Sequence, residues 1–421
     1  MDEPKETAAK SSGSVEIPAA VQRAGHYEDV LMREAHELTM KKQYAPAAAV
    51  LNDVVQRFGV TLEPQQKSLL HSELGTLFFW LGDYDSARRH CEDAAAFSDT
   101  NDQAFIILGK IAVAQFQFPK ARGYFSKVSS KNSGRPLGMC LVSLKLRDII
   151  GAEVFLRDAE GLVSQTDPEL RVYKTYFQLL KGDPTLAIKE ARTLIKKCER
   201  DPALMLLLAE IFMTAGNYGE ASAVAKKVGH VCPENDGVFA ILAHAAYAEE
   251  DLGAAENHAR DALRFNPANA YAKTVLMKLA TRDGRYETAE VLGMQILADC
   301  PEYSLGHANL GDVYFNQGRY ELAETEYEQT LELMNSQTKG AHLRQARMKF
   351  IEEDYKAAAH ILEKLIESEH TYYDDAMCDL FLCYERLGDE EKKDDIVDKM
   401  QVRRSFYRRT ENLLKSFEEN S

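Results

Sequence analysis

Small, apolar and turn-forming positions recur along this chain at a fixed step of 34 residues, most clearly between about residues 200 and 340. Leucines, alanines and prolines keep the step: Leu208, Leu242, Leu276 and Leu310; Ala221, Ala255, Ala289 and Ala323; Pro233, Pro267 and Pro301. Glycines recur after one or two steps, as Gly216, Gly284 and Gly318. A period of this length predicts stacked copies of one supersecondary unit. A generic bundle of long helices would not require it.

Each position has a physical role in a pair of helices. A leucine beside a small residue, as in Leu310-Gly311, allows the second helix of the pair to approach closely. A glycine such as Gly318 ends the first helix, because glycine adopts the left-handed conformation at low cost. An alanine such as Ala323 marks the helix crossing, and a proline ends the second helix. Neither helix buries its apolar face alone, so neighbouring pairs must stack.

This pattern resembles the tetratricopeptide repeat. Residues 304–337 are the clearest copy, through Leu310, Gly311, Tyr314, Gly318, Tyr320, Ala323 and Tyr327. The resemblance implies an all-α fold, a right-handed α-solenoid of about eleven helical hairpins with a C-terminal capping helix. The predicted superhelix covers residues 21–402, with repeats starting near 28, 68, 102, 133, 168, 202, 236, 270, 304, 339 and 374.

The ends and two of the repeats depart from the pattern. The first repeat has an insertion around 58–64, and the repeat near 133 has Arg147-Asp148 in place of the turn glycine. Residues 1–20 contain no aromatic side chain, so we expect a disordered tail. Residues 403–421 are predicted to form a capping helix and tail, because Phe406, Leu413, Leu414 and Phe417 recur at helical spacing.

Composition narrows the classes of partner. The formal charge of −15 disfavours a phosphate backbone as ligand, so we expect no nucleic acid. The seven cysteines are scattered, which predicts reduced thiols in the core of a cytoplasmic protein. No run of about 18 apolar residues occurs, so no transmembrane segment is expected.

Motifs for catalysis are missing from the sequence. It contains no phosphate-binding loop, no glycine-rich dinucleotide turn and no HExxH helix. The eleven histidines are dispersed, and most carboxylates fall on faces that the repeat places in solvent. The sequence therefore predicts a protein that is not an enzyme and holds no cofactor and no metal ion.

The resemblance also predicts where a partner binds, because in this family the first helix of each hairpin lines a concave groove. Two groups of residues fall at groove-facing positions. The apolar group is Tyr173, Tyr176, Leu207, Met213, Ile241, His244 and Tyr247, and the polar, locally basic group is Lys278, Arg282, Asn309, Arg344 and Arg347. We expect an extended or helical segment of another protein there, with its acidic part at the basic end. Alternatively, some aromatic side chains pack between hairpins, or a tightly wound superhelix covers them.

The expected function is a non-enzymatic scaffold or adaptor in a larger hetero-oligomeric cytoplasmic assembly. The chain resembles the subunits made only of repeats that occur in ciliary trafficking complexes, such as the Bardet–Biedl type coat and intraflagellar transport, and in the anaphase-promoting complex. We favour the ciliary class. The alternative is a soluble receptor or co-chaperone that captures peptides.

One form of that alternative has a residue signature, a five-residue carboxylate clamp that binds chaperone tails. Asn309 and Arg344 fall at matching positions, whereas Thr274, Lys278 and Gly340 replace the other three residues. Two matches of five do not favour a clamp.

Overall fold

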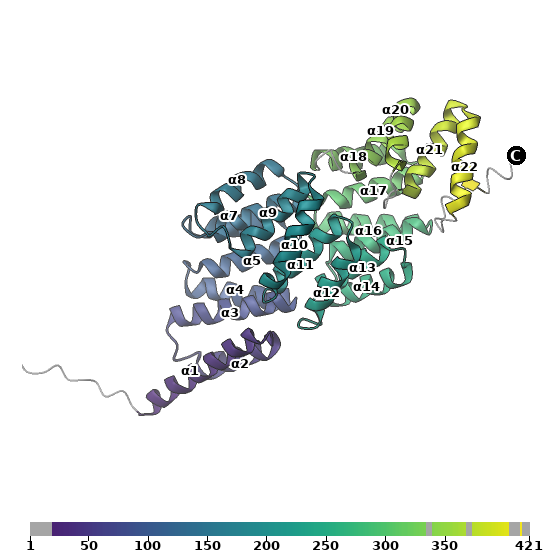
Figure 1. Cartoon of the computed structure of the whole chain (residues 1–421). Helices are drawn as coiled ribbons and strands as arrows, with labels where there is room; N and C mark the ends of the chain where they lie inside the picture. Colours follow the sequence, from purple (N-terminus) through teal and green to yellow (C-terminus); the bar gives the residue numbers. More distant parts are fainter. Residues whose placement is uncertain (1–18, 334–338, 368–372, 404–412, 415–421) are drawn as a thin grey trace, which may run out of the picture.

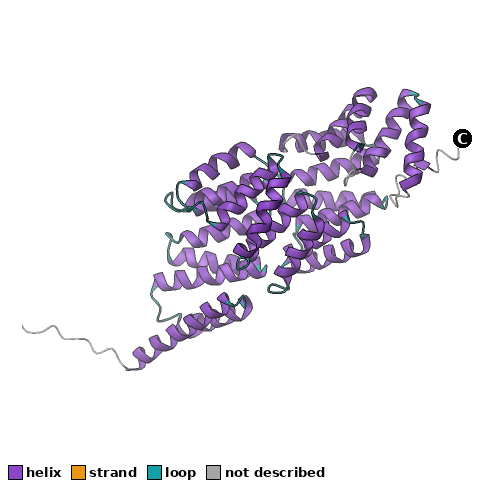
Figure 2. Cartoon of the chain, in the orientation of Figure 1, coloured by secondary structure: helices purple, strands orange, loops and turns teal. Residues whose placement is uncertain are grey.

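The computed structural model describes residues 19–333, 339–367, 373–403 and 413–414. Within these residues every regular element is a helix (Figure 2). The first helices of the hairpins are α1 Ala19–Met40, α3 Pro64–Leu81, α5 Asp102–Ala114, α7 Gly134–Lys145, α9 Pro168–Leu180, α11 Pro202–Thr214, α13 Asp236–Ala248, α15 Ala270–Arg282, α17 Ser304–Asn316, α19 Lys339–Ile351 and α21 Tyr373–Leu387. The second helices are α2 Tyr44–Phe58, α4 Tyr84–Phe97, α6 Phe118–Lys127, α8 Ile149–Glu160, α10 Pro184–Cys198, α12 Tyr218–Gly229, α14 Leu252–Phe265, α16 Tyr286–Asp299, α18 Tyr320–Leu333, α20 Tyr355–Ile366 and α22 Glu390–Arg403.

The helices pair in chain order and the pairs stack in one direction. Figure 1 shows the array running from α1 and α2 at the purple end to α21 and α22 at the yellow end. Each odd-numbered helix packs on the helix that follows it, and from α3 to α17 consecutive odd-numbered helices also pack on one another, as α3 packs on α4 and α5. The predicted α-solenoid of about eleven hairpins is therefore confirmed.

The repeated small residues lie where the helices cross. Ala221, Ala255 and Ala323 are fully buried, as the 34-residue step predicts. Gly311 shows why the neighbouring position is also small, because a Cβ atom there would lie 2.6 Å from the ring of Tyr327. The turn glycine Gly318 has φ 72°, in the left-handed region that glycine tolerates.

Five hairpin turns place a non-glycine residue in the left-handed conformation instead. These residues are Lys42, Phe116, Arg147, Glu250 and Glu353, with φ between 58° and 63°. Such a conformation is uncommon for residues that carry a Cβ atom and often marks a functional position. Phe116 and Arg147 are distinguished from the other three by lining a cavity inside the array, which is described below.

The superhelix winds tightly enough for its N-terminal hairpins to touch hairpins much later in the chain. The Tyr44 hydroxyl donates to the Arg200 carbonyl at 3.0 Å, and the Asn235 amide donates to the Trp80 carbonyl at 3.0 Å. These pairs are 156 and 155 positions apart in sequence. Gly82 fits this contact because a Cβ atom there would lie 2.8 Å from the Cα atom of Asn235.

A second closing contact is aromatic. The ring of Phe116 lies 5.0 Å from that of Tyr271 and 4.6 Å from that of Tyr303, measured between centroids. Next to it, the Cys300 thiol donates to the Gln115 carbonyl at 3.4 Å, across 185 positions of sequence. The interior of the array is therefore partly enclosed along this stretch.

All seven cysteines are free and buried, as the sequence predicts. The predicted tail, residues 1–20, lies outside the described residues except for its last two positions, which begin α1. The predicted capping helix, residues 403–421, also lies outside them apart from 403, 413 and 414. None of the helices in the described part of the chain is long and apolar enough to cross a membrane.

A buried ionic network joins the last hairpins. The fully buried guanidinium of Arg347 on α19 donates to Asp379 at 2.6 Å, Asp312 at 2.7 Å and Asp375 at 3.1 Å. These carboxylates belong to α17 and α21, so one side chain holds three consecutive first helices together. Arg344 adds a second ion pair to Asp312.

We predict that Arg347→Met destabilises this end of the array by about 3–5 kcal/mol, because it removes a counter-charge from the buried carboxylate of Asp379. Hydrogen exchange of α19 and α21, together with urea unfolding, measures the loss. The matched control is Arg319→Met, which removes a surface ion pair with Glu290 and is expected to change stability by at most about 1 kcal/mol. Equal effects of the two substitutions would contradict this account.

Candidate functional site

A cavity of about 320 Å³ lies inside the array. Its wall consists almost entirely of first helices and the turns beside them, from α3 to α17. Aromatic and aliphatic side chains predominate: Phe79, Trp80, Val113, Phe116, Leu141, Tyr173, Tyr176, Leu204, Leu206, Leu207, Ile241, Tyr271 and Tyr303. The sequence placed a partner-binding surface on the first helices, and a cavity lies there.

A second cavity of about 170 Å³ continues the first toward the C-terminal hairpins, sharing Met213 and His244 with it. We call the two together the central groove. It contains ten of the twelve predicted site residues: Tyr173, Tyr176, Leu207, Met213, Ile241, His244, Tyr247, Lys278, Arg282 and Asn309. The lining of neither cavity includes Arg344 or Arg347.

Tyr173 and Tyr176 are more deeply buried than a freely accessible binding surface would be, with exposed fractions of 1% and 4%. The Tyr173 hydroxyl donates to Glu169 at 2.6 Å, and the Tyr176 hydroxyl donates to Glu210 at 3.0 Å. Burial raises the pKa of both phenols, and the adjacent carboxylates raise it further. Both tyrosines therefore lie inside the array, and their hydroxyl groups already have hydrogen-bond partners.

Two lysines of the groove are neutralised inside the protein. Lys145 pairs with Glu210, which also accepts a hydrogen bond from Tyr271 at 3.0 Å. Lys110 pairs with Glu169 at 2.7 Å. Burial opposes ionisation of Glu169, but attraction to Lys110 outweighs it and the pKa of the carboxyl falls.

Arg147 differs from these lysines. It lines the larger cavity, and its guanidinium has neither an ion pair nor a hydrogen bond within the part of the chain that the structure describes. Burial raises the pKa of the Tyr176 and Tyr303 hydroxyl groups, which line the same cavity, and the positive charge of Arg147 opposes that rise. A half-buried cation is stabilised by a counter-charge, and the Arg147 guanidinium has hydrogen-bond donors but no such counter-charge among the described residues.

Lys278 carries a second such charge, in the smaller cavity. Its ammonium lies 5.7 Å from the centroid of the Tyr247 ring and forms no ion pair with any described residue. Close by, the Nε2–H of His244 donates to the Tyr271 carbonyl at 3.2 Å. Burial and the charge of Lys278 together lower the pKa of His244 to about 3, so this imidazole is neutral at physiological pH.

The predicted basic end of the groove needs correction. Arg344 and Arg347 each have an exposed fraction of 1%, and the aspartates described above neutralise them. They therefore stabilise the fold and do not offer charge to a ligand. The same burial removes Arg344 from a carboxylate clamp, and the Asn309 amide donates to the Leu305 carbonyl of its own helix.

Several groove residues were not predicted. Phe79 and Trp80 lie near the end of the first helix α3, a groove-facing place in the repeat, but the prediction did not include them. Phe116 lies in the turn after α5 and reaches the groove because the superhelix closes on itself. Arg147 did leave a signal in the sequence, as the residue that replaces a turn glycine.

Comparison with known proteins agrees with this architecture. The model of the tetratricopeptide repeat matches residues 304–336, the clearest copy in the sequence. No curated protein is significantly similar to the chain in sequence. The chain is thus an α-solenoid of stacked helical hairpins. Within it, residues 304–336 form a tetratricopeptide repeat by the family comparison.

Solved structures resemble the chain in fold at low sequence identity. The APC/C hetero-tetramer Cut9–Hcn1 matches with 13% identity and a TM-score of 0.50, over 88% of this chain and 86% of that chain. Yeast Tom70 matches with 14% identity and a TM-score of 0.39, over 94% and 96%. The human IFIT1 dimer with PPP-AAAA matches with 12% identity and a TM-score of 0.45, over 88% and 89%.

We predict that His244 makes the array sensitive to acid. Unfolded histidine takes up a proton near pH 6.5, whereas folded His244 does so only near pH 3. Stability that is present above pH 6.5 is therefore lost as the pH falls toward 3, by about 2 kcal/mol between pH 7 and pH 5. The measurement is urea unfolding at the two pH values.

His244→Gln keeps a donor for the Tyr271 carbonyl and should lose less stability on acidification than the wild type. His360→Gln, at an exposed position on α20, serves as control and should behave like the wild type. An unchanged response to pH in His244→Gln would refute the assignment.

Proposed function

We propose that the chain is a non-catalytic protein-interaction scaffold whose central groove holds a short apolar segment of a partner protein, with an acidic group of that segment paired to Arg147. The observation that carries this proposal is the combination found in one cavity: an aromatic wall and a cation without a counter-charge among the described residues. Apolar cavities with few polar groups are the usual form of a binding pocket.

The dimensions of the groove restrict the kind of ligand. A cavity of about 320 Å³ that continues into one of about 170 Å³ accommodates a few side chains of an extended or helical segment, not a folded domain. The aromatic part favours apolar anchors, and Arg147 and Lys278 favour a carboxylate at either end of them. Phosphate backbones are disfavoured as ligands by the net charge of −15.

We further propose that the chain acts within a hetero-oligomeric cytoplasmic assembly of the ciliary trafficking class. The free, buried cysteines suit a reducing compartment. The Cut9–Hcn1 structure, which shares the fold, is itself a hetero-tetramer, so an array of this plan can assemble with other chains. Anaphase-promoting assemblies are the alternative within this class.

A soluble peptide receptor is the second candidate, supported by the enclosed form of the groove. Affinity purification of the tagged chain from cell extract, followed by mass spectrometry, separates the two. A scaffold co-elutes with stoichiometric partner chains, and the identity of those chains tests the ciliary assignment. A receptor elutes as a monomer and releases peptide ligands.

We predict that Arg147→Glu changes the sequences that the groove selects. A phage-displayed library of random peptides, selected on the full chain, should yield aromatic or aliphatic anchors near Asp or Glu. The charge reversal should weaken binding of these peptides at least tenfold, about 1.4 kcal/mol, because it replaces attraction by repulsion. Fluorescence polarisation with a selected peptide measures the change.

The matched control is Lys189→Glu, an equal change of charge at an exposed position of the second helix α10. It should leave the affinity unchanged. Arg147→Glu is preferable to alanine at Tyr173 and Tyr176, because those buried tyrosines also stabilise the array. The proposal fails if the selected peptides share no acidic residue, or if both charge reversals weaken binding equally.

A further inference from the structure

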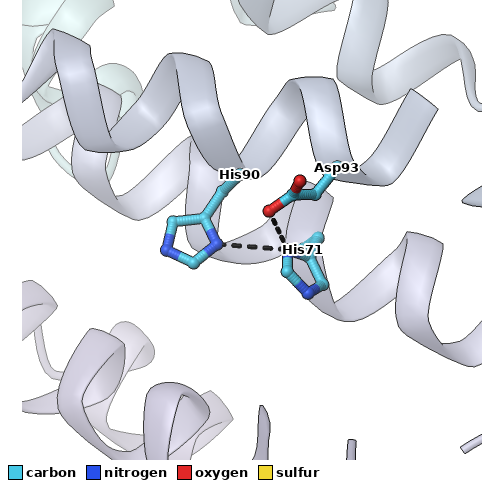
Figure 3. Close-up of side chains that lie close together, drawn as sticks. All are labelled: His71, His90 and Asp93. Atoms are coloured by element: carbon cyan, nitrogen blue, oxygen red, sulfur yellow. Dashed lines mark hydrogen bonds and ion pairs between the residues drawn. The ribbon is translucent and has the colours of Figure 1, made fainter. Parts of the chain in front are cut away.

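Two histidines that are 19 positions apart in the sequence lie next to each other in the second hairpin. His71 belongs to α3, and His90 and Asp93 lie three positions apart on α4 (Figure 3). The Nδ1 atoms of the two histidines are 3.2 Å apart, and the His71 Nδ1 atom lies 3.5 Å from an Asp93 carboxylate oxygen. One potential ligand atom from each of the three residues lies within 4.8 Å of the other two.

Aromatic neighbours fix the orientation of both imidazoles. The His90 ring stacks on Phe78, with centroids 5.4 Å apart and an interplanar angle of 3°. The His71 ring contacts Phe97 at 5.5 Å. The side chain of Asp93, in contrast, is 58% exposed and can turn. Two ligand atoms are therefore positioned in advance, and the third is adjustable.

The hydrogen bonding within this cluster is incomplete. The His71 Nδ1 atom contacts both the His90 Nδ1 atom and the Asp93 carboxylate, but one neutral nitrogen carries at most one proton. Burial lowers the pKa of both imidazoles, although Asp93 opposes the shift at His71. Two imidazole nitrogens and a carboxylate oxygen, each of a type that binds metal ions, thus converge at one place.

We propose that His71, His90 and Asp93 bind a divalent transition metal ion of the zinc type, with a fourth position open to water. In a tetrahedral site with zinc–ligand distances near 2.0–2.1 Å, two ligand atoms lie about 3.3 Å apart. The separations of 3.2 Å and 3.5 Å match this geometry with little movement. The remaining separation closes by rotation of the exposed Asp93.

The ligand set selects the class of metal. Mg²⁺ and Ca²⁺ prefer oxygen ligands, whereas imidazole suits zinc, copper, nickel and iron. Two imidazoles and one carboxylate therefore favour the transition metals. Because the ligands come from both helices of the hairpin, a bound ion joins α3 to α4.

The test is isothermal titration of the untagged full chain with Zn²⁺, after treatment with a chelator and under reducing conditions. We expect one equivalent to bind. Asp93→Asn changes an exposed side chain, so folding should persist, and it should weaken binding at least tenfold. His90→Gln should abolish it. Co²⁺ serves as a spectroscopic probe, because its visible absorption reports the coordination number.

His360→Gln is the matched control, since it removes an imidazole that faces solvent on α20. It should bind one equivalent with the wild-type affinity. Circular dichroism of each variant verifies the fold. The proposal is overturned if the wild type shows no saturable binding at micromolar Zn²⁺, or if Asp93→Asn binds as tightly as the wild type. Neither result bears on the central groove, whose peptide binding is measured without metal.

Discussion

The close approach of paired helices at buried small residues is the constraint on which the rest of this structure depends. Ala255 and Ala323 have no exposed surface, and Gly311 leaves room only for the ring of Tyr327. Hairpins that pack this closely stack with a small, regular rotation, which makes the array wind. The winding brings Phe116 against Tyr303, 4.6 Å between ring centroids, and encloses the central groove. The central groove therefore results from the packing of small residues that do not line it.

Because the interior of the array is enclosed, most of its charged side chains lie in ion pairs. Charged groups that lose water must find a partner, so Lys110 pairs with Glu169, Lys145 pairs with Glu210, and Arg347 binds three aspartates. Arg147 is an exception in the groove, and its backbone adopts an unfavourable left-handed conformation at the same time. The missing counter-charge supports the proposal that Arg147 pairs with an acidic group of a ligand.

The sequence predicted most of the fold because residues close together in the chain specify each repeat. Leucine, glycine and alanine in phase specify one hairpin, and stacking follows from the apolar faces. Groove-facing positions depend only on the place in the repeat, and ten of the twelve residues chosen this way line the central groove, although their role in binding stays a prediction. The pairing of Arg344 and Arg347 was not, because Asp312 and Asp379 lie one repeat away on either side. Contacts between superhelical turns, such as Asn235 with Trp80, depend on accumulated rotation and leave no local pattern.

The two sites also meet in one hairpin. His71 and His90 lie between α3 and α4, and the same hairpin supplies Phe79, Trp80 and Tyr84 to the groove. Its turn, at Gly82, carries the contact to Asn235 that closes the superhelix. A metal ion that joins α3 to α4 restricts the motion of the hairpin that forms one wall of the groove. Because such coupling is reciprocal, a segment that orders this wall must strengthen metal binding by the same factor by which the ion strengthens binding of the segment.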